Sequence, residues 1–173
     1  MIKKNSRTKV AIVGAGFVGT TFAYSLLIRS LVSEIVLIDA DKDRAEGEAM
    51  DLSQGLPFLE PVDVRAGNYS DCKDSDIVVV TAGGARKSGQ SRLELAKENF
   101  ALMSEVISKI TQYNEKCILL MVTNPLDVMT YSALKLSDFS KTKVIGSGTV
   151  LDTARLRYLL GEYLGVDSRN VHS

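Results

Sequence analysis

The chain has 173 residues, of which 45% are hydrophobic and 24% charged, and this balance is typical of one ordinary globular domain. Its 21 basic and 21 acidic residues cancel and form no block of like charge, which argues against a nucleic-acid or anionic-membrane partner. The two cysteines, Cys72 and Cys117, match no metal-binding or redox spacing. We therefore expect no metal site and two reduced, partly buried thiols, as in a cytoplasmic protein.

The first apolar stretch, residues 10–28, contains no charged side chain and follows several basic residues. Such a pattern also occurs in signal peptides and membrane spans. Here three glycines interrupt the stretch, Thr20 and Thr21 lie in its middle, and no small-residue cleavage site follows. A strand over 9–13, a tight turn and a helix over 17–31 explain it better.

The rest of the chain continues this alternation of short apolar runs and longer helical patterns. Asp41 and Ser91 are expected N-caps, Ser91 in capping-box spacing with Glu94, and Gly165 is expected just past the last helix. The glycine-rich, polar residues 83–90 predict a mobile loop. Apolar strands without alternation indicate a sheet covered on both faces, and so a doubly wound parallel α/β fold with right-handed crossovers. Further strands are predicted at 34–39, 62–66, 76–81, 116–122 and 143–145, and further helices at 41–54, 91–113, 126–136 and 150–164.

A glycine pattern between the first strand and the first helix predicts a dinucleotide-binding site. Gly14, Gly16 and Gly19 have GxGxxG spacing, and Asp39 ends the next strand 20 residues after Gly19. Gly14 is expected to permit the tight turn, Gly16 to let the backbone approach the pyrophosphate, and Gly19 to let helix and strand pack closely. An acid at Asp39 accepts hydrogen bonds from a ribose diol and repels a 2′-phosphate, which favours NAD over NADP. Two alternatives remain at this point. The cofactor could be a flavin, or the pattern could be a plain glycine turn with an incidental acidic residue.

Three later segments are expected to meet beyond the carboxyl ends of the strands, where doubly wound sheets bind ligands: residues 81–92, 122–127 and 146–155. With these segments the sequence closely resembles the L-lactate/malate dehydrogenase family, over essentially the whole chain and most of all bacterial L-lactate dehydrogenases. The resemblance rests on GAGFVG, the strand-end Asp39, GEAMDLSQGLPF, TAGGARKSGQSR, TNPLDVMTY and GSGTVLDTAR, in that order.

The resemblance implies a role for each matching residue of the substrate site. Arg92 matches the arginine on a mobile loop that polarises the substrate carbonyl, and Asn124 the asparagine that orients the substrate oxygen. Arg155 matches the arginine that clamps the substrate carboxylate, and Asp152 the aspartate that pairs with the catalytic histidine. Besides the fingerprint residues, the cofactor contacts implied are Val18, Arg44, Tyr69, Gly83, Gly84, Val122, Asn124 and Ser147.

Each of these substrate-site residues also has a purely structural reading when taken alone. Arg92 at a helix start is commonly a solvated residue, and Asn124 before Pro125 commonly ends a strand. Asp152 and Arg155 have i,i+3 spacing and form a plain ion pair on many helix surfaces. Their joint occurrence in family order favours the functional reading.

Arg86 leaves the substrate open between pyruvate and oxaloacetate. The lactate-specific pattern has glutamine at this position, whereas an arginine resembles malate dehydrogenases, where it pairs with a second carboxylate. Ser88 replaces a usual proline, which should loosen the loop. The whole-chain pattern favours lactate dehydrogenase, with malate dehydrogenase as the alternative.

The family's catalytic histidine lies in a Gly-Glu-His-Gly-Asp stretch that is not present in residues 1–173. His172 matches an earlier histidine, which with the arginine matching Arg157 lines a fructose 1,6-bisphosphate site in allosteric bacterial members. The alternative is that Arg157 is a plain helix-surface residue and His172 a terminal residue, and that neither binds an anion.

The expectation is thus an NAD-binding Rossmann domain over residues 1–148, with 149–173 beginning a substrate domain whose remainder is missing. The resemblance implies a cytoplasmic, glycolytic homotetramer that transfers hydride between NADH and a 2-keto acid. The 173 residues alone are expected to be inactive. There are two other hypotheses. The chain could be an NAD-binding module without catalysis, or a fragment that self-associates through exposed apolar surface.

Overall fold

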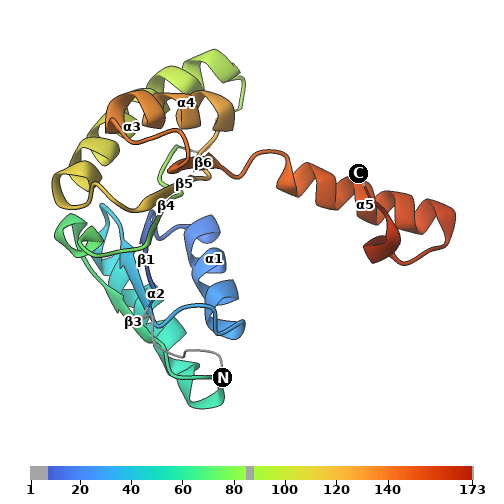
Figure 1. The fold of residues 1–173 in the computed structure, drawn as a ribbon, viewed down its shortest axis with the longest axis horizontal. Helices are drawn as coiled ribbons and strands as arrows, with labels where there is room; N and C mark the ends of the chain where they lie inside the picture. The colour runs from blue at the N-terminus through green and yellow to red at the C-terminus, as the bar shows by residue number, and fades with distance from the viewer. Residues whose placement is uncertain (1–7, 85–87, 173) are drawn as a thin grey trace.

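The computed structural model describes residues 8–84 and 88–172, and a single parallel sheet organises this part of the chain. Its strand order is β3-β2-β1-β4-β5-β6, with all five pairings parallel (Figure 1). The order reverses between β1 and β4, which is the arrangement of dinucleotide-binding folds. The strands are β1 (Lys9–Val13), β2 (Glu34–Ile38), β3 (Asp63–Ala66), β4 (Ile77–Val80), β5 (Ile118–Met121) and β6 (Val144–Gly146).

Helices connect these strands, and the expected alternation of strand and helix is confirmed. Three short 3₁₀ turns were not predicted, because a three- or four-residue turn has no periodicity to read. The helices are α1 (Phe17–Ile28), α2 (Lys42–Gln54), α3 (Arg92–Tyr113), α4 (Leu126–Ser137) and α5 (Val150–Leu164), and the 3₁₀ turns are η1 (Leu56–Phe58), η2 (Tyr69–Cys72) and η3 (Ser168–Asn170).

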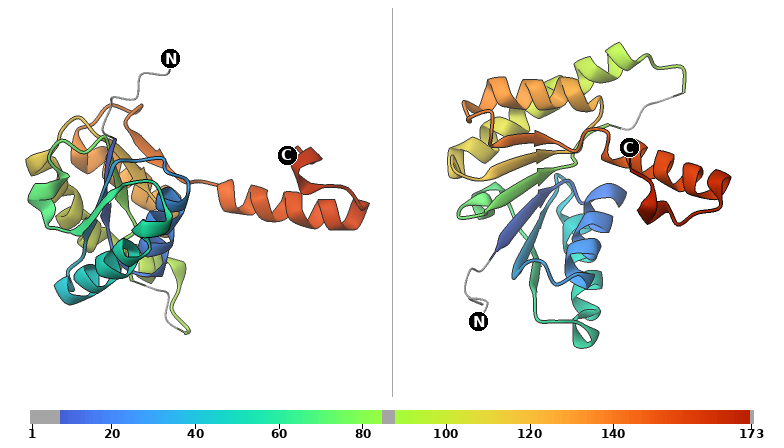
Figure 2. Two further views of the ribbon diagram at one scale, coloured as in Figure 1. Left: turned by 90° about the horizontal axis from the view of Figure 1, so that it is seen from below. Right: turned by 45° about the vertical axis from the view of Figure 1, so that its right-hand side comes forward.

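Two apolar cores lie on opposite faces of the sheet, as the unbroken apolar strands predict. In β1, Val10 and Ile12 pack with α1 and α2, whereas Ala11 and Val13 pack with α3 and α4. Figure 2 shows these two helix layers with the strands between them. The doubly wound α/β fold is therefore confirmed.

The predicted helix ends are confirmed for α2, α3 and α5. The Asp41 side chain accepts from the Arg44 backbone N–H at 3.1 Å, and Ser91 and Glu94 form the reciprocal capping box. Gly165 adopts a left-handed φ of 66° after α5. These ends depend only on neighbouring residues, which is why sequence alone predicts them.

The first helix is shorter than the prediction of 17–31. Ser30 has φ 50°, and the Leu31 N–H bonds to the Leu26 carbonyl five residues back at 3.2 Å. This is the bonding of a Schellman ending, in which a left-handed residue stops the helix. The apolar pattern in the sequence continues past this stop because Leu31 is apolar. In the structure Leu31 lies outside the helix and is 61% exposed.

Helix α5 projects away from the sheet (Figures 1 and 2). It packs against η3, where Gly161, buried in α5, faces the Val166 carbonyl and Ser168. Many of its apolar side chains are exposed, Tyr163 to 86%. Within the described residues, no helix combines the length and apolar character needed to cross a bilayer.

The two cysteines are free thiols, and both are more buried than expected. Cys72 is 0% and Cys117 2% exposed, so the prediction of partial burial was wrong. Burial raises the pKa of Cys72 to about 12 and that of Cys117 to about 11. Both therefore remain protonated near neutral pH and act as small apolar core residues.

Candidate functional site

The glycine loop between β1 and α1 has one closely confined glycine at each end and an open one between them. Gly14 has φ 110°, and a Cβ placed there would lie 2.6 Å from the Ala82 nitrogen. A Cβ on Gly19 would lie 1.9 Å from the Gly14 carbonyl oxygen. A Cβ on Gly16 would meet nothing within 4 Å. The fold therefore explains the first and third glycines, and Gly16 faces open space.

That open space lies at the N-terminus of α1. Gly16 is the N-cap and offers no side-chain acceptor, so the first N–H groups of α1 are available to an anion together with the positive end of the helix dipole. Val18, a predicted cofactor residue in this turn, is 57% exposed. A phosphate bound there would lie directly beside Gly16, which is the property expected of a pyrophosphate cradle.

Asp39 holds the glycine loop as well as facing the site. Its Oδ2 accepts from the Ala15 N–H at 2.6 Å, and its Oδ1 accepts from the Asp41 N–H at 2.9 Å. Each carboxylate oxygen has a second lone pair, so acceptor capacity remains for a ribose diol. Sequence reasoning assigned Asp39 only to the ligand and missed its bond to the loop.

Two threonines connect the carboxyl ends of three neighbouring strands. The Thr81 hydroxyl, after β4, donates to the Gly14 carbonyl at 2.8 Å, and the Thr123 hydroxyl, after β5, donates to the Ala82 carbonyl at 2.7 Å. Both connections were missed at the sequence level, because Thr81 and Gly14 are 67 residues apart. A threonine directly after each apolar strand was the available signal.

Asn99 on α3 joins the same edge of the sheet, and sequence reasoning missed it too. Its side-chain oxygen accepts from the Gly84 N–H at 2.8 Å, and its side-chain nitrogen donates to the Asn124 carbonyl at 2.7 Å. Asn99 is 2% exposed and lies between Leu95 and Met103, both buried and four residues away along the helix. One polar residue within an apolar helix stripe was the signal that pointed to it.

The structure brings several predicted cofactor residues to this carboxyl edge. Gly83 and Gly84 follow β4, and Val122 and Asn124 follow β5. Ser147 follows β6, and its N–H donates to the Met121 carbonyl at 2.9 Å. These five residues come from three adjacent strand ends, on the β4–β6 side of the point where the strand order reverses.

Arg44 and Tyr69 lie on the other side of that point. Arg44, in the first turn of α2, is exposed and lies 3.9 Å from an Asp41 carboxylate oxygen. Tyr69, in η2 after β3, packs against the core with the Lys109 ammonium 5.2 Å from its ring centre. Burial raises the pKa of Tyr69 to about 12, so its phenol is neutral at physiological pH.

The two predicted loop arginines are the least defined part of the site. Arg86 lies outside the described residues. Arg92 is described as the first residue of α3, directly after the Ser91 cap.

The predicted residues on α5 contact each other. An Arg155 guanidinium nitrogen lies 3.3 Å from an Asp152 carboxylate oxygen, with side chains 64% and 73% exposed. This is the helix-surface ion pair considered as the structural alternative, and a pair so exposed contributes little stability. Arg157 donates to the carbonyls of Ser168 and Arg169 at 3.3 Å each, and His172 is exposed.

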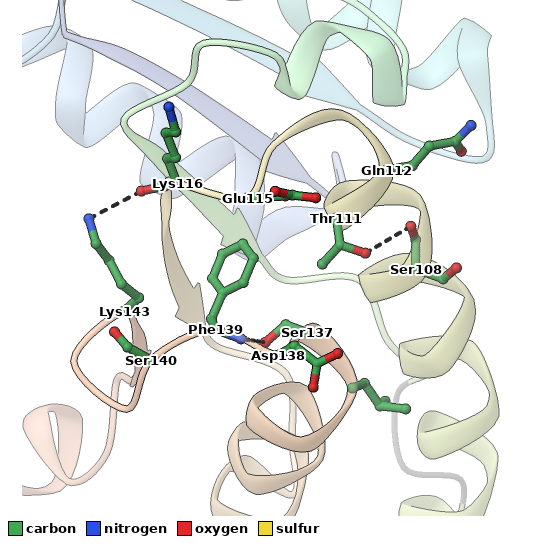
Figure 3. Close-up of a pocket in the computed structure, with 11 residues that line it drawn as sticks. Ser108, Thr111, Gln112, Glu115, Lys116, Ser137, Asp138, Phe139, Ser140 and Lys143 are labelled. Atoms are coloured by element: carbon green, nitrogen blue, oxygen red, sulfur yellow. Dashed lines mark hydrogen bonds between the residues drawn. The ribbon is translucent and has the colours of Figure 1, made fainter.

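A pocket of about 900 Å³ lies at the opposite edge of the sheet, near the amino ends of β5 and β6 (Figure 3). Lys143 borders it and donates to the Lys116 carbonyl at 3.1 Å, and Phe139 also lines it. No predicted site residue lines this pocket. Within the described residues, no cluster of His, Cys, Asp or Glu side chains is arranged to hold a metal ion.

Comparison with known proteins decides between the cofactor alternatives. Residues 8–146 match the model of the lactate/malate dehydrogenase NAD-binding domain. The chain belongs to the lactate/malate dehydrogenase family. NAD is therefore the cofactor of this domain, and the flavin alternative falls away.

Its relatives include L-lactate dehydrogenase of Acetivibrio thermocellus, 56% identical over 95% of this chain, and L-lactate dehydrogenase 1 of Clostridium acetobutylicum, 51% identical over 99%. The chain spans about half the length of these relatives, 52% and 54%. Among solved structures, the minor L-lactate dehydrogenase of Enterococcus mundtii matches with a TM-score of 0.93 at 39% identity, covering 97% of this chain and 54% of the other. A lactate dehydrogenase from a Medee basin deep-sea metagenome matches with a TM-score of 0.92 at 47% identity over the same shares.

The predicted contact of Asp39 with the ribose diol, added to its bond to the glycine loop, leads us to expect a specific change in cofactor preference. Asp39→Asn removes the charge and one of the two acceptor oxygens, so NADH affinity is expected to fall roughly tenfold or more. NADPH affinity should fall much less, because repulsion of its 2′-phosphate is also removed. Fluorescence titration of both cofactors measures the ratio. Asp63→Asn, an exposed carboxylate at the amino end of β3, is the control. An unchanged NADPH-to-NADH ratio would contradict the assignment.

Proposed function

We propose that this chain is the NAD-binding part of an L-lactate dehydrogenase, which transfers hydride between NADH and pyruvate. The single observation that carries the proposal is the open approach to Gly16 at the uncapped N-terminus of α1, since this space fits a pyrophosphate. The names of the relatives support lactate as the product and do not favour malate.

Within this proposal, the nicotinamide end of NAD lies over the β4–β6 side of the edge, and Asn124 orients the substrate oxygen there. Arg92 polarises the carbonyl through its positive charge, which stabilises the negative charge that develops on that oxygen. Arg155 binds the substrate carboxylate, and Asp152 pairs with a catalytic histidine. These last two roles require the Asp152–Arg155 ion pair to separate, and its high exposure makes that separation inexpensive.

Substrate choice is assigned to Arg86. Pyruvate is the proposed substrate, and an Arg86 that points into the site would instead favour oxaloacetate through its second carboxylate. Rates with pyruvate and oxaloacetate, compared before and after Arg86→Gln in the whole enzyme, decide this. If the ratio of the pyruvate rate to the oxaloacetate rate is unchanged, Arg86 does not take part in substrate recognition.

The broader organisation is also proposed. Residues 1–148 form the NAD-binding domain, and 149–173, which include α5, begin the substrate domain. The whole enzyme is proposed to be a cytoplasmic homotetramer that binds fructose 1,6-bisphosphate at Arg157 and His172. Arg157 would have to release the Ser168 and Arg169 carbonyls to bind that anion. Its Nε, buried and without a hydrogen-bond partner among the described residues, is consistent with such a rearrangement.

The test of the proposed function is NADH binding by the 173-residue chain. Titration should show saturable NADH binding and a weaker response to NADPH. Addition of pyruvate then separates the alternatives: binding without NADH oxidation supports a binding module. Oxidation would show that no further histidine is needed. No NADH binding by a monomeric, folded chain overturns the proposal, and light scattering identifies the case of self-association through α5.

A further inference from the structure

The Asn99 side chain uses both of its polar atoms to join two chain segments at the site. One segment is the turn after β4, held through the Gly84 N–H, and the other is the turn after β5, held through the Asn124 carbonyl. The two contacts span 15 and 25 residues of sequence. Because Asn99 is 2% exposed, water cannot replace either bond without opening the core.

The packing around these turns is tight, and Thr123 adds a second connection between them. A Cβ on Gly83 would lie 2.5 Å from the Thr123 methyl carbon and 3.5 Å from the Asn99 amide nitrogen. The Thr123 hydroxyl holds the Ala82 carbonyl one residue before Gly83. Thr123 thus fixes the start of the turn after β4, and Asn99 fixes its continuation at Gly84.

We infer that Asn99 is a positioning residue that sets the turns at Gly83–Gly84 and Asn124 for the nicotinamide half of NAD. The inference rests on the proposed function, which places the nicotinamide over β4 to β6. Asn99 itself is buried and acts through the two turns. It also lies on α3, the helix that begins at Arg92, so the same helix supports the turns and carries the proposed substrate arginine.

This role predicts that loss of Asn99 weakens binding of the nicotinamide half alone. AMP occupies only the adenosine half, on the side of Asp39, and serves as the probe of that half. Asn99→Ala should weaken NADH binding roughly tenfold or more, because the Gly84 N–H and the Asn124 carbonyl both lose their bond to Asn99, while AMP affinity should change less than about threefold. Calorimetric titration of NADH and of AMP into the 173-residue chain gives both values.

Asn114 provides the matched control. It is also a buried amide on the end of α3, bonded to the Cys72 and Ser75 carbonyls, but it lies at the opposite edge of the sheet. Asn114→Ala should lower thermal stability and leave both affinities unchanged. A role of Asn99 in stability alone would make the two variants behave alike.

Asn99→Asp keeps an acceptor for the Gly84 N–H and places a second acceptor against the Asn124 carbonyl, so it decides the matter if Asn99→Ala does not fold. It should reduce NADH affinity and leave AMP affinity unchanged. If the Asn99 variants bind NADH as Asn114→Ala does, or lose AMP and NADH in parallel, the inference is overturned while the proposed function stands. If the unaltered chain does not bind NADH, both the inference and the proposed function are overturned.

Discussion

Gly16→Ala is expected to reduce NADH affinity about 100-fold, which corresponds to about 2.7 kcal/mol, while the protein stays folded. Nothing lies within 4 Å of the new methyl group, and Gly16 has φ −83°, which alanine adopts freely. Alanine at an N-cap lowers stability by less than about 1 kcal/mol relative to glycine. The methyl group instead occupies the space through which a pyrophosphate approaches the first N–H groups of α1.

Fluorescence titration with NADH, combined with thermal unfolding, checks this prediction. Gly47→Ala is the matched control, because Gly47 lies on the exposed side of α2 and its Cβ would also meet nothing within 4 Å. Alanine in a helix interior should raise stability by about 1 kcal/mol and leave NADH binding unchanged. Equal NADH affinity in the two variants would show that the space at Gly16 is not used by the cofactor.

Gly19→Ala is expected to act on the fold itself. The new Cβ would lie 1.9 Å from the Gly14 carbonyl oxygen and 2.9 Å from the Thr81 hydroxyl, and the nearer of these belongs to the backbone. Either α1 moves away from the loop or the loop deforms. Overpacking of this kind predicts a loss of about 3 kcal/mol in the free energy of unfolding. For a chain of this length the melting temperature should fall by roughly 6–12 °C.

Calorimetry of Gly19→Ala beside Gly16→Ala measures the contrast between two glycines three residues apart. The Gly19 variant should lose stability and, with it, NADH affinity, whereas the Gly16 variant should lose affinity alone. Identical melting temperatures for the two variants would contradict the close packing of α1 on the loop.

The sequence predicted the parts of this molecule that depend on neighbouring residues. Apolar runs and helical spacing identified the six strands and five long helices of the described residues. Short-range capping patterns identified the ends at Asp41, Ser91 and Gly165. The first helix was overextended to Leu31, because a left-handed stop at Ser30 leaves the hydrophobic pattern unchanged.

The glycine spacing likewise predicted the tight turn and the helix start that follows it, because both belong to one continuous segment. Only the tertiary structure showed which atoms surround each of the three glycines. Gly14 and Gly19 are confined by Ala82 and by the loop itself, and Gly16 is free.

Tertiary structure alone also decided which side chains hold the site together. Asp39 bonds to the loop at Ala15, and Asn99 joins turns 15 and 25 residues away. Local sequence carries information about backbone conformation and burial, whereas these contacts exist only because a parallel sheet brings the ends of distant strands to one edge. For the same reason the sequence determined that this chain has a glycine loop leading into a helix, and the assembled sheet determined which residues support that loop.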